Sequence, residues 1–322
     1  MRPAEEKYIS LLTDFGFKRI FGKKPNKMLL IDFLNALFDG EQVVRDVTYL
    51  NSEHVGDVYA ERKAIFDVYC ENERGEKFIV EMQNAYQTYF KDRSLYYATF
   101  PIREQAPKGS AWDFQLQHVY VVALLNYDLQ EAAFAEEDIH HDVGLLDKKT
   151  HRVFNDKLTF KYVEIAKFDK PLEKLETCYD KWLFVLKNLS RLERQPKELR
   201  DKVFDRVFKE AEIAHFTPAE LRHYEDSLKA FRDVKNCIDS AEEKGRAEGR
   251  EEGRAEGRAE GRAEGRAEGL AEGLAKGLAK GQAEGERAKA IEIAKQLLAM
   301  HLPMESITKA TGLSSADITA LK

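Results

Sequence analysis

The chain has 322 residues, long enough to bury a sizeable core and to hold two domains. Charged residues make up 34% of it, yet the formal net charge is −6, which argues against a basic nucleic-acid scaffold. Any contact with nucleic acid must therefore come from local patches. The three scattered cysteines make neither a metal-binding spacing nor a disulfide framework. No apolar run approaches the ~20 residues of a membrane span and no signal-peptide pattern is present, so we expect a cytoplasmic protein without membrane contact.

Helices and strands are expected to alternate over residues 1–170, which predicts an α/β or α+β domain. Residues 5–38 have apolar positions at helical spacing, and Gly40 can end this helical region. The next expected elements are a strand at 43–50, a hairpin at 65–83, a helix at 85–104 and strands at 118–126 and 158–165. The strand at 118–126 is apolar nearly throughout, which indicates burial on both faces.

The hairpin is the most informative part of the chain. Two apolar runs flank a polar turn that contains Gly75, a residue that tolerates the positive φ of tight turns. If the turn centres near Arg74, Asp67 lies directly opposite Glu81, with the two Cβ atoms roughly 4.5–5.5 Å apart. Two like charges so placed cost free energy unless something positive lies between them, and a divalent cation is the natural candidate.

Strand alternation adds to this interpretation. It predicts one face made of Ile65, Asp67, Tyr69, Ile79, Glu81 and Gln83, and an apolar opposite face made of Phe66, Val68, Phe78, Val80 and Met82. Two acids on a solvated sheet face are the simpler explanation. However, the Phe, Ile and Val residues that flank both acids indicate buried strands, and buried carboxylates need partners or a metal.

The chain from residue 171 to about residue 240 is expected to be a helical section packed on the core. Helices are predicted at 177–188 and 198–210, and a third begins after Thr217. The sequence Thr217-Pro-Ala-Glu220 has the pattern of a capping box with proline at the first helical position.

Residues 241–285 are a repeat in which a glycine recurs at every fourth position from Gly245 to Gly285. Collagen is excluded, because its glycine period is three. Eleven glycines disfavour an isolated helix by roughly 10 kcal/mol relative to alanine. Two alternatives remain: a partly helical, charge-rich spacer, or a helix stabilised by packing, in which Arg and Glu stripes pair between chains and give a homo-oligomer.

Residues 286–322 regain a helical pattern and predict a small module. Gly312 lies between two short predicted helices, as in a helix-turn-helix. The second of them, Ser-Ser-Ala-Asp-Ile-Thr-Ala-Leu, has few groups suited to reading bases, so an interaction or assembly module is favoured over a DNA reader.

Three blocks of the sequence resemble one protein family. They are Asp67 followed by Glu81-Met-Gln83, the segment Thr13-Asp-Phe-Gly-Phe-Lys-Arg-Ile-Phe-Gly22, and Arg93 with Tyr96-Tyr97. Together, over roughly residues 8–235, the chain looks like the Rpn-type recombination-promoting nucleases, which are also classed with transposases and fall in the PD-(D/E)XK superfamily. The repetitive charged tail is likewise familiar from that family.

The resemblance implies a restriction-endonuclease-like mixed sheet flanked by helices and a Mg²⁺-dependent DNA endonuclease, with Mn²⁺ as a second option. In that scheme Asp67 and Glu81 bind the metal, together with the main-chain carbonyl of Met82. Asp14 matches the early acidic residue of the family and could complete the site through a water. Asp67, Glu81, Gln83 and Asp14 then form the catalytic set.

The chain departs from the superfamily pattern at Gln83, which occupies the position of a lysine. Glutamine donates and accepts hydrogen bonds but carries no charge. Gln83 is the usual residue in the narrower family, so it does not by itself imply inactivity, but the group that assists the nucleophile is left open. Lys91 and Arg93 on the next helix are candidates.

Six basic residues are candidates for DNA contact: Lys18, Arg19, Lys23, Lys24, Lys27 and Arg93. For those near Asp14, a solvated helix end is an equally good explanation. The alternative to an active nuclease is a nuclease-fold protein that has lost its chemistry and acts as a DNA-binding or assembly module.

Overall fold

The computed structural model describes residues 6–54, 64–106, 112–129, 131 and 133–321. The chain divides into two compact units, Met1–Ala241 and Glu242–Lys322. The division falls inside one helix, α6 (Pro218–Ala299).

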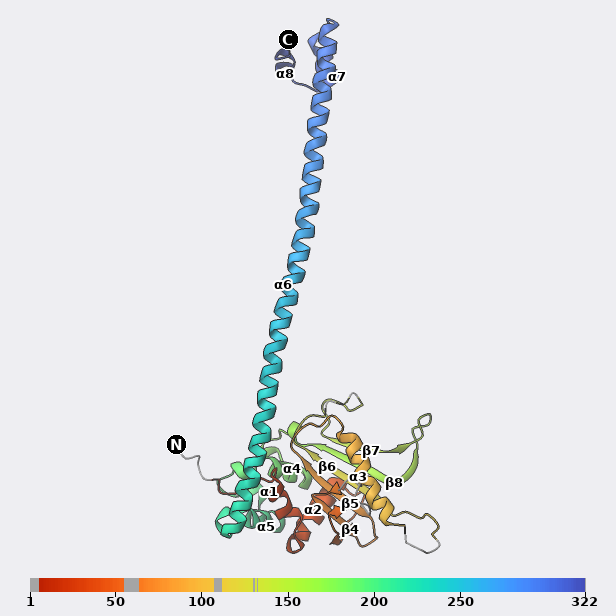
Figure 1. The fold of residues 1–322 in the computed structure, drawn as a ribbon, viewed down its shortest axis with the longest axis vertical. Helices are drawn as coiled ribbons and strands as arrows, with labels where there is room; N and C mark the ends of the chain where they lie inside the picture. The colour runs from red at the N-terminus through yellow and green to blue at the C-terminus, as the bar shows by residue number, and fades with distance from the viewer. Residues whose placement is uncertain (1–5, 55–63, 107–111, 130, 132, 322) are drawn as a thin grey trace. The chain divides into compact units, whose positions relative to one another are not determined.

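Unit 1 combines a mixed sheet with helices (Figure 1). Besides the first part of α6, its α-helices are α1 (Asp14–Phe21), α2 (Lys27–Phe38), α3 (Phe90–Glu104), α4 (Cys178–Asn188) and α5 (Lys202–Ala211). Its strands are β1 (Val47–Tyr49), β2 (Glu53–His54), β3 (Ala64–Ile65), β4 (Val68–Asn72), β5 (Lys77–Gln83), β6 (Val119–Leu125), β7 (His140–Leu146) and β8 (Val153–Glu164). Short 3₁₀ turns lie at Lys24–Asn26, Ile165–Lys167, Leu172–Lys174, Leu189–Arg191, Lys197–Leu199 and Ile213–His215.

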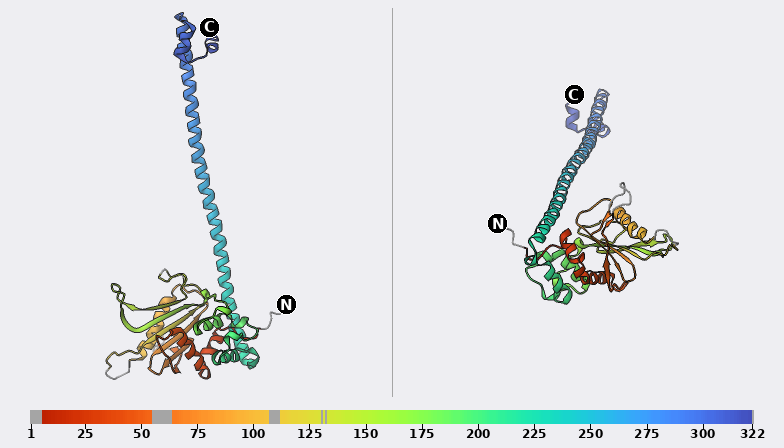
Figure 2. Two further views of the ribbon diagram at one scale, coloured as in Figure 1. Left: turned by 180° about the vertical axis from the view of Figure 1, so that it is seen from behind. Right: turned by 60° about the horizontal axis from the view of Figure 1, so that its bottom comes forward.

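The main sheet has the strand order β1-β4-β5-β6-β8-β7, with β5, β6 and β8 parallel and the other neighbours antiparallel. Helices α1, α2, α4 and α5 cover one face, and α3 covers the other (Figures 1 and 2). Every residue of β6 is buried, as its apolar sequence predicts. This arrangement is consistent with the expected restriction-endonuclease-like α/β fold.

The structure corrects the expected start of the fold. From residue 6 to Thr13 the described chain is not helical; Tyr8 instead forms a β-bridge with Glu212, and the Ile9 N–H donates to the carbonyl of Ala211. Helix α1 begins only at Asp14, where the Thr13 side chain accepts the N–H of Gly16. Tertiary pairing with a distant segment therefore overrides the local helical pattern.

Strand lengths also differ from expectation. The predicted strand at 43–50 reduces to the three residues of β1. Strand β8 is longer than predicted and pairs with β7, which the sequence pattern did not indicate. Much of this hairpin is exposed, so the alternation of buried and exposed side chains that marks a half-buried strand is weak there.

The hairpin of β4 and β5 has the predicted register. Val68 pairs with Val80 and Tyr69 with Ile79, and Gly75 takes a φ of 77° in the turn. Val68, Phe78, Val80 and Met82 join the core beneath α1 and α2, as alternation predicts, whereas Tyr69 and Ile79 join the core beneath α3. Phe66 is the exception. It also packs in the α3 core, because the chain bends at Asp67 before β4 begins.

In the helical section Thr177 and Asp180 form a capping box at α4, which was not predicted. The predicted cap at Thr217 is also present. At α6 the Glu220 N–H donates to Thr217 Oγ1 over 3.3 Å, and Glu220 Oε2 accepts the N–H of Thr217 over 3.0 Å.

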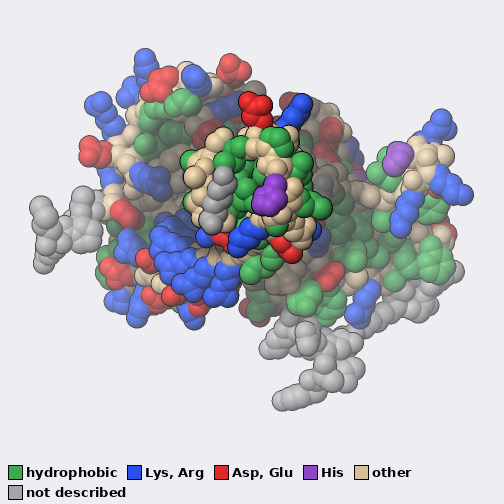
Figure 3. All heavy atoms as spheres, turned by 90° about the horizontal axis from the view of Figure 1, so that it is seen from above, with side chains coloured by type: hydrophobic (Ala, Val, Ile, Leu, Met, Phe, Trp, Pro, Cys, Tyr) green, Lys and Arg blue, Asp and Glu red, His purple; other side chains and the backbone are tan. Residues whose placement is uncertain are grey.

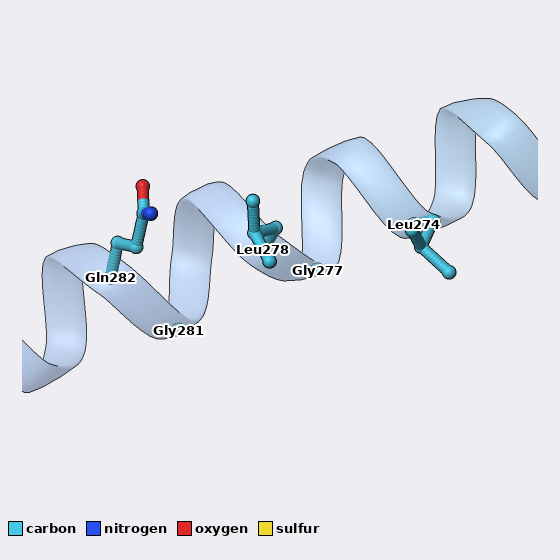
Figure 4. Close-up of a pocket in the computed structure, with 5 residues that line it drawn as sticks. All are labelled: Leu274, Gly277, Leu278, Gly281 and Gln282. Atoms are coloured by element: carbon cyan, nitrogen blue, oxygen red, sulfur yellow. The ribbon is translucent and has the colours of Figure 1, made fainter.

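In unit 2, helix α6 continues through the whole repeat. A Cβ added at any of the eleven repeat glycines would meet nothing within 4 Å. Leu270, Leu274 and Leu278 are exposed along this stretch. Leu274 and Leu278 lie beside Gly277 and Gly281 (Figure 4). The repeat is thus helical although no described residue packs against its glycines.

The C-terminal module consists of the end of α6, α7 (Met304–Thr311) and α8 (Ser315–Thr319). Gly312 ends α7 with a φ of 70°, and Ser314 caps α8. Ala294, Ile307, Leu313 and Ile318 form its small core. Across the described part of both units, no helix is long and apolar enough to cross a bilayer.

Candidate active site

The two acids of the hairpin meet at the bend that directly precedes β4. The Asp67 N–H donates to Glu81 Oε1 over 3.2 Å, and the Met82 N–H donates to Asp67 Oδ2 over 2.9 Å. Because Asp67 lies in the bend rather than in the strand, its carboxylate turns onto the backbone of β5. The sequence-based prediction that Asp67 and Glu81 lie together is met, through backbone-mediated contacts rather than a simple cross-strand pair.

Burial governs the electrostatics of this pair. The Glu81 side chain is only 6% exposed and the Asp67 side chain 20%. Burial, and secondly the charge of Asp67, raise the pKa of Glu81 to about 8. Burial also raises the pKa of Asp67, against the opposing effect of the Met82 N–H. Two buried carboxylates that resist ionisation are a site where a bound cation would be favourable.

Met82 presents its backbone to the same place. In a strand the N–H and C=O of one residue project to the same side, and the Met82 N–H points at Asp67. The next residue faces the other way, since the Gln83 carbonyl accepts the Asn126 N–H beyond β6. The Met82 carbonyl is therefore directed toward Asp67, on the side where β4 no longer pairs with β5.

Gln83, at the end of β5, is buried and bonded to the pair. Its Nε2 donates to Glu81 Oε2 over 3.2 Å. On the α3 side, Arg93 Nη2 lies 4.0 Å from the same oxygen. Arg93 is held by Gln87, whose Oε1 accepts from its Nη1 over 2.6 Å, and its guanidinium lies over the rings of Phe90 and Tyr97.

Helix α1 contributes Asp14 and Lys18, one turn apart. Lys18 Nζ lies 2.6 Å from Asp14 Oδ1 and 3.7 Å from Asp67 Oδ1. Burial alone would lower the pKa of the Lys18 ammonium, but the hydrogen bond and charge of Asp14, with Asp67 and Glu81 behind it, raise it. Asp14 itself is mostly exposed, at 62%, and reaches the site through Lys18.

The donor set fits a hard divalent cation. Mg²⁺ in proteins takes one or two carboxylates and keeps several waters, and carbonyl oxygen is an acceptable further ligand. Asp67, Glu81 and the Met82 carbonyl meet that description. No group of three or more His, Cys, Asp or Glu side chains in metal-binding distance occurs among the described residues, so Asp14 is not a direct third carboxylate ligand in this arrangement.

The remaining basic candidates differ in availability. Arg19 is buried, donating to the Glu210 carbonyl and to Glu220, so its charge is compensated inside unit 1 rather than facing solvent. Three others, Lys23, Lys24 and Lys27, are exposed, although Lys23 pairs with Glu220 and Lys27 with Asp46. On the face drawn in Figure 3, basic and acidic side chains occur together, so local groups of Lys and Arg exist within the negative overall balance.

Sequence reasoning placed Lys18 among general DNA contacts and missed its position beside Asp67. Its spacing from Asp14, four residues on a helix, shows only that these two can pair. The packing of α1 against the sheet brings Lys18 to the hairpin. Lys91, considered as an assisting group, instead pairs with Glu131 over 2.7 Å.

Two family models match the chain. One, described as PD-(D/E)XK nuclease family transposase, matches residues 11–241 and so includes the whole candidate site. The other, described as the C-terminal HTH domain of the Rpn/YhgA-like nuclease family, matches residues 287–322. No curated protein and no solved structure matches.

Proposed function

The chain belongs to the PD-(D/E)XK nuclease family transposases, and we propose that it is a metal-dependent DNA endonuclease that promotes recombination by hydrolysing phosphodiester bonds. The observation that carries the proposal is the buried pair of Asp67 and Glu81, bonded through the β5 backbone at the end of the hairpin. The nuclease and helix-turn-helix matches together indicate a protein that binds DNA.

In this proposal Asp67, Glu81 and the Met82 carbonyl hold Mg²⁺, with Mn²⁺ as an alternative. A cation held there would neutralise the scissile phosphate and activate a water for attack. The chain's own residues prepare the site. Met82 N–H orients Asp67, and the Asp67 N–H together with Gln83 orients Glu81. Asp14 is not a direct metal ligand in this proposal; it would contact the metal site through Lys18 or through a water.

DNA contact is proposed for exposed basic residues near the site and for the C-terminal module. Lys23, Lys24 and Lys27 lie on the surface after α1 and suit phosphate contact. Residues 1–170 would form the nuclease core, 171–240 its helical support, 241–285 a spacer and 286–322 a helix-turn-helix module. We place this activity in the cytoplasm, a compartment that suits free cysteines such as Cys70, Cys178 and Cys237.

A plasmid assay tests the proposal. Purified protein should nick or cut supercoiled DNA with Mg²⁺ and not with a chelator. Asp67→Ala and Glu81→Ala should each abolish cleavage, whereas Glu71→Ala, on the same hairpin but paired with Lys77, should leave it intact. Equal cleavage by the wild type and both site variants would overturn the assignment of the site.

A second candidate function is favoured by the absence of charge at Gln83. A nuclease-fold protein without chemistry would bind DNA or assemble with other chains. Calorimetry separates the two: intact DNA binding with no Mg²⁺ or Mn²⁺ binding would support this alternative.

We further propose that the repeat can join two copies of the chain. Leu270, Leu274 and Leu278 are exposed, and the small residues Gly277 and Gly281 beside the last two would allow a second helix to approach closely (Figure 4). Packing of this kind would offset the cost of the eleven glycines. Deleting residues 241–322 and measuring mass in solution tests it, and an unchanged oligomeric state would overturn it.

A further inference from the structure

The third position of the nuclease motif carries no charge in this chain. Where a lysine would place an ammonium beside the attacking water, Gln83 donates its amide hydrogen to Glu81 Oε2. Gln83 is therefore used to orient a carboxylate. A reaction that builds negative charge on a phosphate still gains from a fixed positive group close to the reacting atoms. The following inference rests on the proposed function and concerns where that group comes from.

Lys18 is the cation that the fold brings to Asp67. Its Nζ is 3.7 Å from Asp67 Oδ1, and Asp14, one helical turn earlier, holds it at 2.6 Å. Its side chain is 40% exposed, so the ammonium borders both the buried acids and the solvent from which a phosphate would approach. Lys18 thus lies at the boundary where substrate and carboxylates would meet.

The other nearby cations are engaged differently. Arg93 approaches Glu81 to 4.0 Å, but it is packed over two aromatic rings and bonded to Gln87. Lys23 pairs with Glu220 and Lys27 with Asp46, away from the acid pair. Among the described residues, Lys18 is the lysine whose ammonium contacts a carboxylate of the pair.

We propose that Lys18 supplies from helix α1 the positive charge that a lysine at position 83 would supply from the strand. In the complex with DNA its ammonium would touch the attacking water or a phosphate oxygen, which makes it a catalytic residue. Asp14 is then a positioning residue, which holds Lys18 toward Asp67. The proposed role requires only that Lys18 stays positively charged; it involves no proton transfer to or from the ammonium.

Rate measurements on charge variants are the first test. Lys18→Met should lower the single-turnover cleavage rate at saturating DNA by about 100-fold or more, and Lys18→Arg, which keeps the charge, should recover at least tenfold of that loss. Lys7→Met is the matched control, a lysine of similar exposure that is paired with Glu212 and is not among the proposed DNA contacts, and it should cut within about threefold of wild type. A Lys18→Met rate within threefold of wild type would overturn the inference.

DNA affinity separates catalysis from simple phosphate binding. Measured without metal, the affinity of Lys18→Met should fall only a few-fold, as for loss of one phosphate contact. If the DNA affinity of Lys18→Met falls strongly while its cleavage rate at saturating DNA equals that of wild type, Lys18 is only a phosphate contact and the inference is wrong.

Moving the charge gives a sharper test. In the Lys18→Met background, Gln83→Lys places an ammonium at the end of β5 and should raise the rate at least tenfold over Lys18→Met alone. No gain would contradict the equivalence of the two positions. Both proteins in this comparison carry Lys18→Met, so any effect of that substitution on folding is common to the two.

Mg²⁺ affinity provides a readout independent of cleavage. A positive charge 3.7 Å from Asp67 opposes a cation at the same carboxylate, so calorimetry should show Mg²⁺ binding about two- to tenfold more tightly to Lys18→Met. Unchanged or weaker binding counts against Lys18 at the site. If wild type neither cuts DNA nor binds Mg²⁺, the proposed function itself fails; an active wild type with an equally active Lys18→Met variant overturns this inference alone.

Discussion

Replacing Glu81 by glutamine should stabilise the metal-free protein, and by an amount that depends on pH. Burial and the charge of Asp67 raise the pKa of Glu81 from its ordinary 4.5 to about 8. Below pH 4.5 both folded and unfolded chains are protonated there, so the carboxyl has no effect. Between pH 4.5 and 8 the unfolded chain loses the proton while the folded chain retains it, which increasingly favours unfolding.

The magnitude follows from that difference. One pKa unit corresponds to about 1.4 kcal/mol, so the cost of an ionised Glu81 in the folded state reaches at most about 5 kcal/mol above pH 8. Glu81→Gln removes this cost but also loses the attraction to Arg93 and requires the Gln83 amide to turn its oxygen toward the new amide. We expect a net gain of about 2 kcal/mol at pH 8.5 and close to none at pH 5.

Urea unfolding followed by tryptophan fluorescence measures this difference. Both tryptophans, Trp112 and the fully buried Trp182, lie in unit 1, so the signal reports the unit that holds the site. A chelator keeps metal out. Glu71→Gln is the control, because Glu71 is paired with Lys77 on the same hairpin and its loss should destabilise by less than about 1 kcal/mol. Two results would refute the reasoning: a Glu81→Gln protein that is less stable than wild type at pH 8.5, or one whose gain in stability is the same at pH 5 and pH 8.5.

Three further outcomes are expected. Mg²⁺ at ten times its Kd should stabilise wild type by about 1.4 kcal/mol in the same unfolding assay and leave Asp67→Asn unchanged; equal stabilisation of both would move the metal elsewhere. Gly16→Ala should destabilise unit 1 by more than about 2 kcal/mol, because a Cβ there would lie 2.1 Å from the Ser10 carbonyl oxygen; a neutral result in urea unfolding would contradict the tight entry into α1. Replacing Gly253, Gly257, Gly261 and Gly265 by alanine should raise the thermal stability of the helical circular dichroism signal, each change adding about 0.8–1 kcal/mol to the helix, and should leave DNA cleavage unaltered; a loss of cleavage would show that these glycines do more than permit a helix.

The sequence predicts the hairpin and its acids well because their information is local. Turn chemistry at Gly75 and the alternation along β5 suffice to predict the register, and the structure pairs Val68 with Val80 as expected. Asp67, one residue before β4, then meets Glu81 through contacts with the backbone. The same holds for β6, whose continuous apolar sequence indicated a strand buried on both faces. The family resemblance needs the Thr13–Gly22 block and Arg93 with Tyr96-Tyr97 in addition to the hairpin acids.

Features that depend on distant segments could not be predicted. The segment around Tyr8 has a helical pattern, but pairing with residues near Glu212 gives it an extended form. Phe66 changes face because the chain bends at Asp67, and no residue nearby marks that bend as glycine or proline would. Lys18 reaches Asp67 only through the packing of α1 on the sheet, which no spacing along the chain reveals.

The four-residue repeat has a consequence for the orientation of the C-terminal module within unit 2. Four residues advance an α-helix by about 400°, so one added repeat rotates α7 and α8 by about 40° relative to Gly245 and moves them about 6 Å along the axis. Nine repeats make about ten whole turns and restore the original rotation. Tandem repeats gain and lose copies readily. Each gain or loss of one copy would change the direction in which the module faces as well as its distance along the axis. Variants with one, four or nine added copies would separate the effect of angle from the effect of length.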